Sequence, residues 1–183
     1  MAVRKILTIP DPVLYQKAEP VAKFDRKLRG LARDMFETMY EASGVGLAAV
    51  QIGVLQRLLV IDLEDQGFIK GVFINPEVLE VSEEMQEGEE GCLSVPGLSV
   101  PHPRPRWVKI GYQDLNGTKR TVEGEMLLAR AFLHEMDHLD GKVFVDQLEP
   151  DMKLEFAEDI ERIKAGKPPR EAKKPAYRRA RSA

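Results

Sequence analysis

The chain of 183 residues has one cysteine, Cys92, and only three histidines. A single cysteine excludes an intramolecular disulfide framework and is compatible with a reducing compartment. No apolar run approaches the ~18 residues that a membrane-spanning helix needs. After Arg4 and Lys5, the prolines at positions 10 and 12 interrupt the segment, so no apolar core of a secretory signal follows. We therefore expect a cytoplasmic protein with neither a membrane nor DNA as its partner.

The net charge is −3, but the charge is unevenly distributed. Residues 164–183 contain eight basic residues and one acid and carry +7, so the other 163 residues carry −10. We expect residues 1–163 to form the folded domain, because this length can bury a core, and residues 164–183 to form a basic, flexible tail. Such a tail is either a solvated chain end or a contact for a polyanionic partner.

Hydrophobic periodicity predicts three helices and several short strands. The first helix covers residues 25–42, with Asp25 as a suitable N-cap. The second covers residues 125–140 and ends before Gly141, and the third covers residues 151–163. Strands are expected over residues 57–63, 71–74, 77–82, 107–114 and 119–123, and Asn116-Gly117 predicts a hairpin between the last two.

Prolines predict breaks between these segments. Asn75-Pro76 is expected to form a turn, and the proline-rich residues 99–105 an extended connection outside any central strand, with His102 exposed. The order of elements predicts an α+β fold. Its sheets are mixed and mostly antiparallel and surround the central helix of residues 125–140, with one N-terminal and one C-terminal helix beside them.

Residues 134–141 have the sequence HEMDHLDG and contain two of the three histidines. On a helix, His134 and His138 lie one turn apart and about 40° apart around the axis, so both imidazoles can bind one divalent metal. Glu135 between them is displaced around the helix and can reach a water on that metal, as in the H-E-x-x-H pattern. The alternative is an amphipathic helix with solvated histidine and glutamate side chains.

A catalytic metal needs a third protein ligand and an open position. Cys92 can supply a thiolate, which suits Fe(II) or Zn(II), although a free cysteine is more often a small buried apolar residue. A carboxylate from the third helix would instead give the His-His-Glu site of a metallopeptidase that cleaves internal peptide bonds; the acids available there are Glu155, Glu158 and Glu161. The residues alone leave both sites open.

Three stretches together resemble the peptide deformylases. Residues 44–51 have the sequence GVGLAAVQ, residues 90–94 have EGCLS, and residues 134–141 have HEMDHLDG; in this order they match the three motifs of that family. The resemblance covers roughly residues 5–163, so residues 1–163 are expected to be a deformylase-like catalytic domain. The implied activity is hydrolytic removal of the formyl group from N-formylmethionine at the start of newly made proteins, with release of formate.

The resemblance also implies roles for residues of the motifs. The metal, usually Fe(II) with Zn(II), Ni(II) or Co(II) as substitutes, would be bound by Cys92, His134 and His138. Glu135 would be the general base and acid. The oxyanion would be held by the side chain of Gln51 and the backbone N–H of Leu93.

Substrate contacts are expected around the same helix. Gly46 would lie near the substrate backbone, and the methionine side chain would enter an apolar pocket formed by Val45, Leu127 and Ala131.

Other positions concern the surroundings of the metal. The resemblance suggests that Glu90 and Arg104 pair to steady the Cys92 loop. Two residues differ from what is common in the family: Leu133 replaces a glutamine, and Arg130 stands where an apolar residue near the methionine pocket is common. For the basic tail, the origin of the substrate suggests contact with ribosomal RNA through its phosphates.

Overall fold

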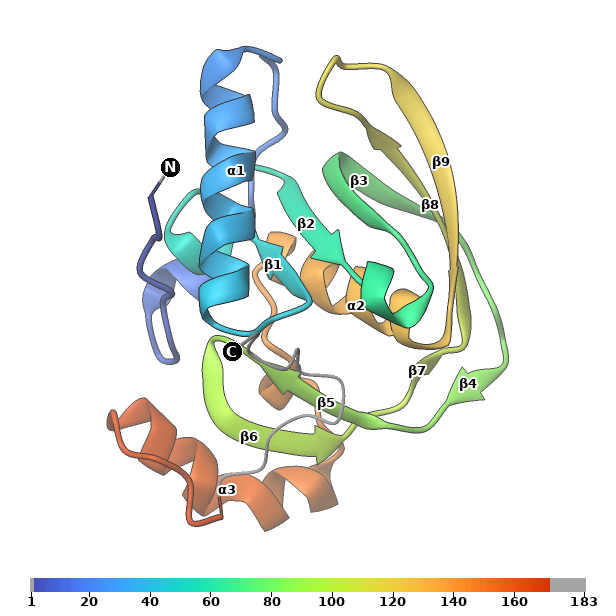
Figure 1. The fold of residues 1–183 in the computed structure, drawn as a ribbon. Helices are drawn as coiled ribbons and strands as arrows, with labels where there is room; N and C mark the ends of the chain where they lie inside the picture. The colour runs from blue at the N-terminus through green and yellow to red at the C-terminus, as the bar shows by residue number, and fades with distance from the viewer. Residues whose placement is uncertain (1, 172–183) are drawn as a thin grey trace.

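The computed structural model describes residues 2–171, and its fold is α+β (Figure 1). The largest sheet has five antiparallel strands in the order β1-β2-β3-β8-β9. These strands are β1 (Gly46–Ala48), β2 (Leu58–Asp62), β3 (Lys70–Val81), β8 (Trp107–Gln113) and β9 (Lys119–Glu125). Helix α2 (Met126–Leu139) follows β9 directly and packs against this sheet.

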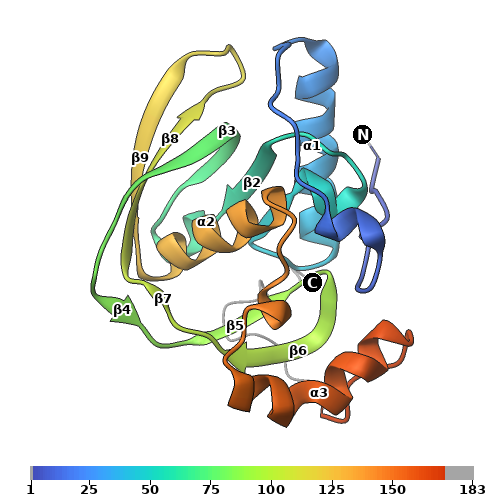
Figure 2. The ribbon, with the colours of Figure 1, turned by 180° about the vertical axis from the view of Figure 1, so that it is seen from behind.

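Two small antiparallel sheets complete the β-structure. One pairs β4 (Met85–Gln86) with β7 (Arg104–Pro105), and the other pairs β5 (Glu89–Cys92) with β6 (Val95–Pro101). In both views α2 lies between the large sheet and the β5–β6 sheet (Figures 1 and 2). The central helix therefore contacts elements from most of the chain, as the sequence predicts.

Two further helices cover the outer faces. Helix α1 (Arg26–Glu41) packs against β1 and β2, and α3 (Pro150–Lys164) packs against β6. Single 3₁₀ turns link the remaining segments: Pro12–Tyr15, Ala49–Ile52, Glu64–Gln66 and Phe144–Asp146. All three predicted helices are confirmed within one or two residues at each end.

Local chemistry explains where the helices begin and end. The Asp25 carboxylate accepts the backbone N–H groups of Lys27 and Leu28 and caps α1, as predicted. After α2, Gly141 has φ +71°, and a Cβ atom there would lie 2.8 Å from the carbonyl oxygen of Tyr15. Both the left-handed backbone and the contact with the N-terminal arm thus require glycine at this position.

The turn predicted at Asn75-Pro76 is wrong. β3 is one strand that continues through these residues with a register shift between Ile74 and Glu77. Asn75 has φ +50°, and its side chain accepts the backbone N–H of Val21 and donates to the carbonyl of the same residue. The irregularity is therefore a bulge held by the N-terminal arm, a long-range contact that the local sequence does not reveal.

The proline-rich segment also differs from the prediction. Residues 95–101 form β6 and residues 104–105 form β7, each an edge strand of a two-stranded sheet, where proline is tolerated. His102 is partly buried rather than exposed, with its ring centroid 6.4 Å from that of Phe144. The segment between β6 and β7 packs against Phe144 in the segment after α2, and this packing partly buries the imidazole.

The basic segment is described only as far as Glu171, and residues 172–183 lie outside the described part. Arg170 folds back onto α3, where it pairs with Asp159 at 3.0 Å and with Glu158 at 2.8 Å. Within residues 2–171, no helix combines the length and apolar character needed to span a membrane.

Candidate metal centre

Cys92, His134 and His138 converge at the centre of the molecule. Their potential ligand atoms all lie within 4.8 Å of one another, and the Cys92 Sγ is 3.1 Å from the His138 Nε2. Cys92 ends β5, while the two histidines lie one turn apart on α2, so the site forms only when β5 crosses the helix. One thiolate and two imidazoles are a donor set that suits a tetrahedral metal with one open position.

The two histidines have different surroundings. The His134 Nδ1 is 2.6 Å from Oε1 of Glu90, and this bond leaves Nε2 of the same ring for a metal. The His138 Nδ1 is buried and has no hydrogen-bond partner among residues 2–171, while its Nε2 faces Cys92. Their ring centroids are 5.0 Å apart, as expected for imidazoles on successive turns.

Glu90 anchors the outer side of the site and has no exposed surface. Arg104 donates to both of its carboxylate oxygens at 2.6 and 3.0 Å and to Asp137 at 2.7 Å. Burial by itself raises the pKa of Glu90, but the charge of His134 and the hydrogen bonds of Arg104 outweigh burial and hold this pKa well below its usual range. The predicted Glu90–Arg104 pair is therefore present, and it also contacts a histidine of the centre.

Glu135 faces the inner side of the site. It is 5% exposed, and its Oε2 has no hydrogen-bond partner in the described residues. Burial is the largest cause that raises the pKa of Glu135 to about 7, and the charge of Glu90 adds to it, whereas His134 lowers it. A buried carboxyl group with a free oxygen and a pKa near neutrality can accept and return a proton.

Gln51 and Leu93 lie beside the cysteine. The Gln51 Nε2 is 3.5 Å from the Cys92 Sγ and 3.2 Å from the Ser94 Oγ, and its Oε1 accepts the backbone N–H of Ala48. This last bond fixes the amide so that its NH₂ group points toward the centre. Leu93 follows Cys92 in the tight turn between β5 and β6.

The residues predicted to contact substrate lie on α2 or close to it. A Cβ atom at Gly46 would lie 2.5 Å from the Glu135 Oε1, so only glycine fits beside this carboxylate. Val45 and Ala131 are buried in one apolar cluster, and Leu127 packs against it partly buried. These positions are consistent with one apolar wall next to Gly46.

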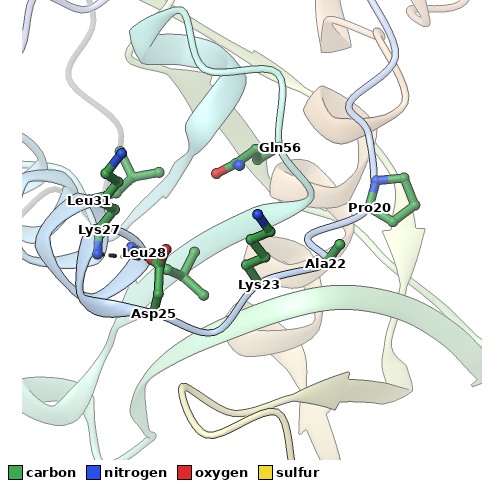
Figure 3. Close-up of a pocket in the computed structure, with 8 residues that line it drawn as sticks. All are labelled: Pro20, Ala22, Lys23, Asp25, Lys27, Leu28, Leu31 and Gln56. Carbon is green, nitrogen blue, oxygen red and sulfur yellow. Dashed lines mark hydrogen bonds between the residues drawn. The ribbon is translucent and has the colours of Figure 1, made fainter.

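A separate pocket lies at the N-terminal end of α1 (Figure 3). Its volume is about 560 Å³, and its lining residues are Pro20, Ala22, Lys23, Asp25, Lys27, Leu28, Leu31 and Gln56. None of the predicted site residues is among them. This pocket therefore does not correspond to the predicted methionine pocket.

The alternative carboxylate ligands do not reach the histidines. Glu155, Glu158 and Glu161 are exposed on α3, and the last two pair with Arg170 and Lys164. The group of potential ligands contains the cysteine instead. The His-His-Glu arrangement is therefore not formed.

Two further positions on α2 are located by the structure. Leu133 is partly buried against the apolar core. Arg130 is 4% exposed, and its guanidinium lies against Glu90 rather than in an apolar pocket. The long side chain of Arg130 thus reaches the buried carboxylate of Glu90.

Sequence reasoning also missed the contact between Glu90 and His134. The strand pattern could have indicated it, because residues two apart in a strand share a face and Glu90 lies two residues before Cys92.

Comparison with known proteins gives a consistent result. The family model described as polypeptide deformylase matches residues 3–153. A peptide deformylase of Finegoldia magna is 47% identical over 148 residues, which cover 81% of this chain and 91% of that protein. The crystal structure of a peptide deformylase from Legionella pneumophila superposes with a TM-score of 0.82 at 44% identity and covers 90% of this chain and 96% of that one. A peptide deformylase from Ehrlichia chaffeensis in complex with actinonin gives 0.82 at 41% identity over 91% and 98%.

Proposed function

Since the chain belongs to the polypeptide deformylase family, we propose that Cys92, His134 and His138 bind its metal ion and that Glu135 transfers the proton. The chain is a hydrolase that removes the formyl group from the N-formylmethionine of newly made proteins and releases formate. The observation that carries the site assignment is the convergence of one thiol and two imidazoles beside a buried carboxyl group with a free oxygen.

The donor set fits a metal ion, which when bound supplies the Lewis acidity that makes water a nucleophile at neutral pH. Glu135 then has two tasks. Its Oε2 accepts the proton of the attacking water, and the same carboxyl group returns that proton to the amine that leaves. Burial suits both tasks, because it keeps the pKa of Glu135 close to the working pH.

The other residues hold the substrate during the reaction. The NH₂ group of Gln51 and the backbone N–H of Leu93 donate to the formyl oxygen as its negative charge develops. Gly46 leaves room for the substrate backbone beside Glu135. The methionine side chain contacts the apolar wall of Val45, Leu127 and Ala131.

Fe(II) is the metal that we propose for the native enzyme. A thiolate with two imidazoles binds Fe(II) as well as Zn(II), Ni(II) or Co(II), and geometry and availability rather than affinity alone select among them. Metal analysis of protein purified without oxygen tests this choice, with iron expected at one atom per chain.

The experiment that tests the function is formate release from an N-formylmethionyl peptide, with the metal content measured on the same sample. Wild-type protein should release formate, and Cys92→Ser should lose or change the bound metal and lose activity. A metallopeptidase without a cysteine ligand would tolerate Cys92→Ser and cleave internal peptide bonds. Cleavage of the unformylated peptide without formate release would contradict the assignment.

We also propose that residues 1–163 form the catalytic domain, that the basic tail contacts ribosomal RNA, and that the protein works in the cytoplasm, where nascent chains emerge. Residues 172–183 contain five basic residues and no acid. A chain that ends at Glu171 keeps the contact of Arg170 with α3 and should bind ribosomes less tightly. Equal binding of both chains at physiological salt would exclude residues 172–183 as the contact.

A further inference from the structure

Arg130 is, after Arg104, the second arginine that donates to Glu90. Its Nη1 donates to the Glu90 Oε2 at 3.0 Å and to the backbone carbonyl of His102 at 2.6 Å, and its Nη2 lies 3.5 Å from the carbonyl oxygen of Gln86. One buried guanidinium on α2 thus contacts the end of β4, the start of β5 and the link between β6 and β7.

The carboxylate of Glu90 accepts four hydrogen bonds, two on each oxygen. Oε1 accepts from the His134 Nδ1 and from one arm of Arg104, both at 2.6 Å. Oε2 accepts from the other arm of Arg104 and from Arg130, both at 3.0 Å. A carboxylate offers about four lone-pair sites, so Glu90 has no acceptor site to spare.

We propose that Arg130 is a positioning residue for the metal centre. Together with Arg104 it prevents rotation of the Glu90 carboxylate, so that Oε1 stays on the His134 Nδ1 and the Nε2 of this ring faces the metal. The inference rests on the proposed metal site. Because Glu90 has no exposed surface, solvent cannot replace the donor that a smaller residue at position 130 would remove.

Gly88 provides the space that Arg130 needs. A Cβ atom at this position would lie 3.1 Å from Nη2 of Arg130 and 3.5 Å from its Cζ. A Cβ atom at position 88 would therefore crowd the guanidinium, and a larger side chain would shift it relative to its acceptors. Gly88 and Arg130 form a matched pair, and the two positions should depend on each other energetically.

Charge balance supports the same role. The cluster contains two buried guanidinium groups, Arg104 and Arg130, the buried carboxylate of Glu90 and the partly exposed carboxylate of Asp137. Removal of one partner from such a cluster leaves a buried charge without compensation, which disturbs the geometry of the remaining partners.

The first test replaces Arg130 by methionine, which keeps a long side chain but has no donor. Arg106→Met is the matched control, because Arg106 is exposed and pairs only with exposed Glu84 in the described structure. The Kd for Zn(II) is measured by chelator competition, and the Nδ1 proton of His134 is followed by NMR in the zinc-loaded protein. We expect Arg130→Met to weaken zinc binding about 10- to 100-fold and to move the His134 resonance, and Arg130→Lys to recover part of both.

The proposal is overturned if Arg130→Met binds zinc within about twofold of wild type with an unchanged His134 resonance, or if the control weakens binding as much. A wild-type chain that binds no zinc, or binds it equally well after Cys92→Ser, would refute the proposed metal site itself instead.

The second test remains informative if Arg130→Met does not fold, because one of its two variants keeps Arg130. Gly88→Val is introduced into wild-type protein and into the Arg130→Met variant, and the same Kd is measured. In the wild-type background valine should weaken zinc binding because it displaces the guanidinium; in the methionine background it should have little further effect. Equal losses in both backgrounds, or no loss in either, would contradict the pairing of the two residues.

Discussion

Two buried glutamates, Glu90 and Glu135, lie near His134. Each is at most 5% exposed, and both are within reach of the same imidazole charge. Glu90 accepts hydrogen bonds on both oxygens from Arg104, Arg130 and His134, whereas no donor in the described part of the chain reaches the Oε2 of Glu135. Burial raises the pKa of each carboxyl group, but only for Glu90 do the partners outweigh burial.

The comparison shows that partners rather than burial decide what a buried carboxyl group does. A carboxylate with every acceptor site occupied stays ionised and holds its neighbours in place. One with a free oxygen and a pKa raised to about 7 can exchange a proton near neutral pH. The same residue type thus serves as an anchor on β5 and as the proposed acid–base group on α2.

Glu135→Gln should remove the proposed proton transfer and give the largest effect on the rate of formate release. The amide keeps the shape of the side chain but cannot accept the proton from water, so the rate of formate release should fall by about 10²–10⁴. The metal content should stay at the wild-type value, because Glu135 is not among the grouped ligand residues. Turnover near the wild-type rate, measured at matched metal content, would show that another group moves the proton.

Gly46→Ala should displace the same carboxylate without changing its chemistry. The new methyl group would lie 2.5 Å from the Glu135 Oε1, so one of the two must move. A shift of this size can cost about 10² in rate when a reacting group is misplaced. Steady-state kinetics should show the loss mainly in kcat, with metal content unchanged. Gly30→Ala is the control, because a Cβ at Gly30 meets nothing within 4 Å; an equal loss in this variant would point to a general effect on stability.

Glu90→Gln should weaken the anchoring of His134 and thereby reduce metal affinity rather than proton transfer. A neutral amide cannot match both arginines and His134, so the zinc Kd should weaken about 10- to 100-fold. Activity measured with saturating metal should recover much more than it does for Glu135→Gln. If Glu90→Gln loses activity at full metal occupancy while its zinc Kd stays normal, Glu90 does not act through metal binding, and the proposed separation from the role of Glu135 in proton transfer is wrong.

Much of this arrangement could be predicted from the sequence. The spacing of four residues between His134 and His138 is enough to predict that both imidazoles lie on one face of a helix. Asp25 and Gly141 predict helix ends because a capping side chain and a left-handed glycine act locally. The Cys92 ligand depended on resemblance, because no local rule brings residue 92 next to residue 138.

The parts that the sequence did not reveal depend on long-range contacts. The sequence marks Arg130 only as a departure from the apolar residue that is common in the family, and its contact with Glu90 depends on the path of β4 and β5. Asn75 behaves in the same way, since its bulge depends on the N-terminal arm. In both cases a polar side chain forms hydrogen bonds with groups far away in the sequence. Hydrophobic periodicity predicts helices and strands but not such long-range partners.

The ion pair between Asp159 on α3 and Arg170 provides a comparison with the buried Glu90 cluster. Its removal should give the smallest effect of the four variants. Asp159 accepts three bonds from Arg170, which hold its pKa below the ordinary value, but Arg170 itself is largely exposed. A lowered pKa in the folded state means that this stabilisation is present at neutral pH and is lost as the pH falls through the acid range. Arg170→Met should therefore lower the thermal midpoint slightly at pH 7, and the difference from wild type should shrink on acidification. Formate release should not change, because Arg170 pairs with Glu158 and Asp159 on α3 and not with a residue of the metal group. A change in zinc Kd comparable to that of Glu90→Gln would contradict this separation of the two ion-pair clusters.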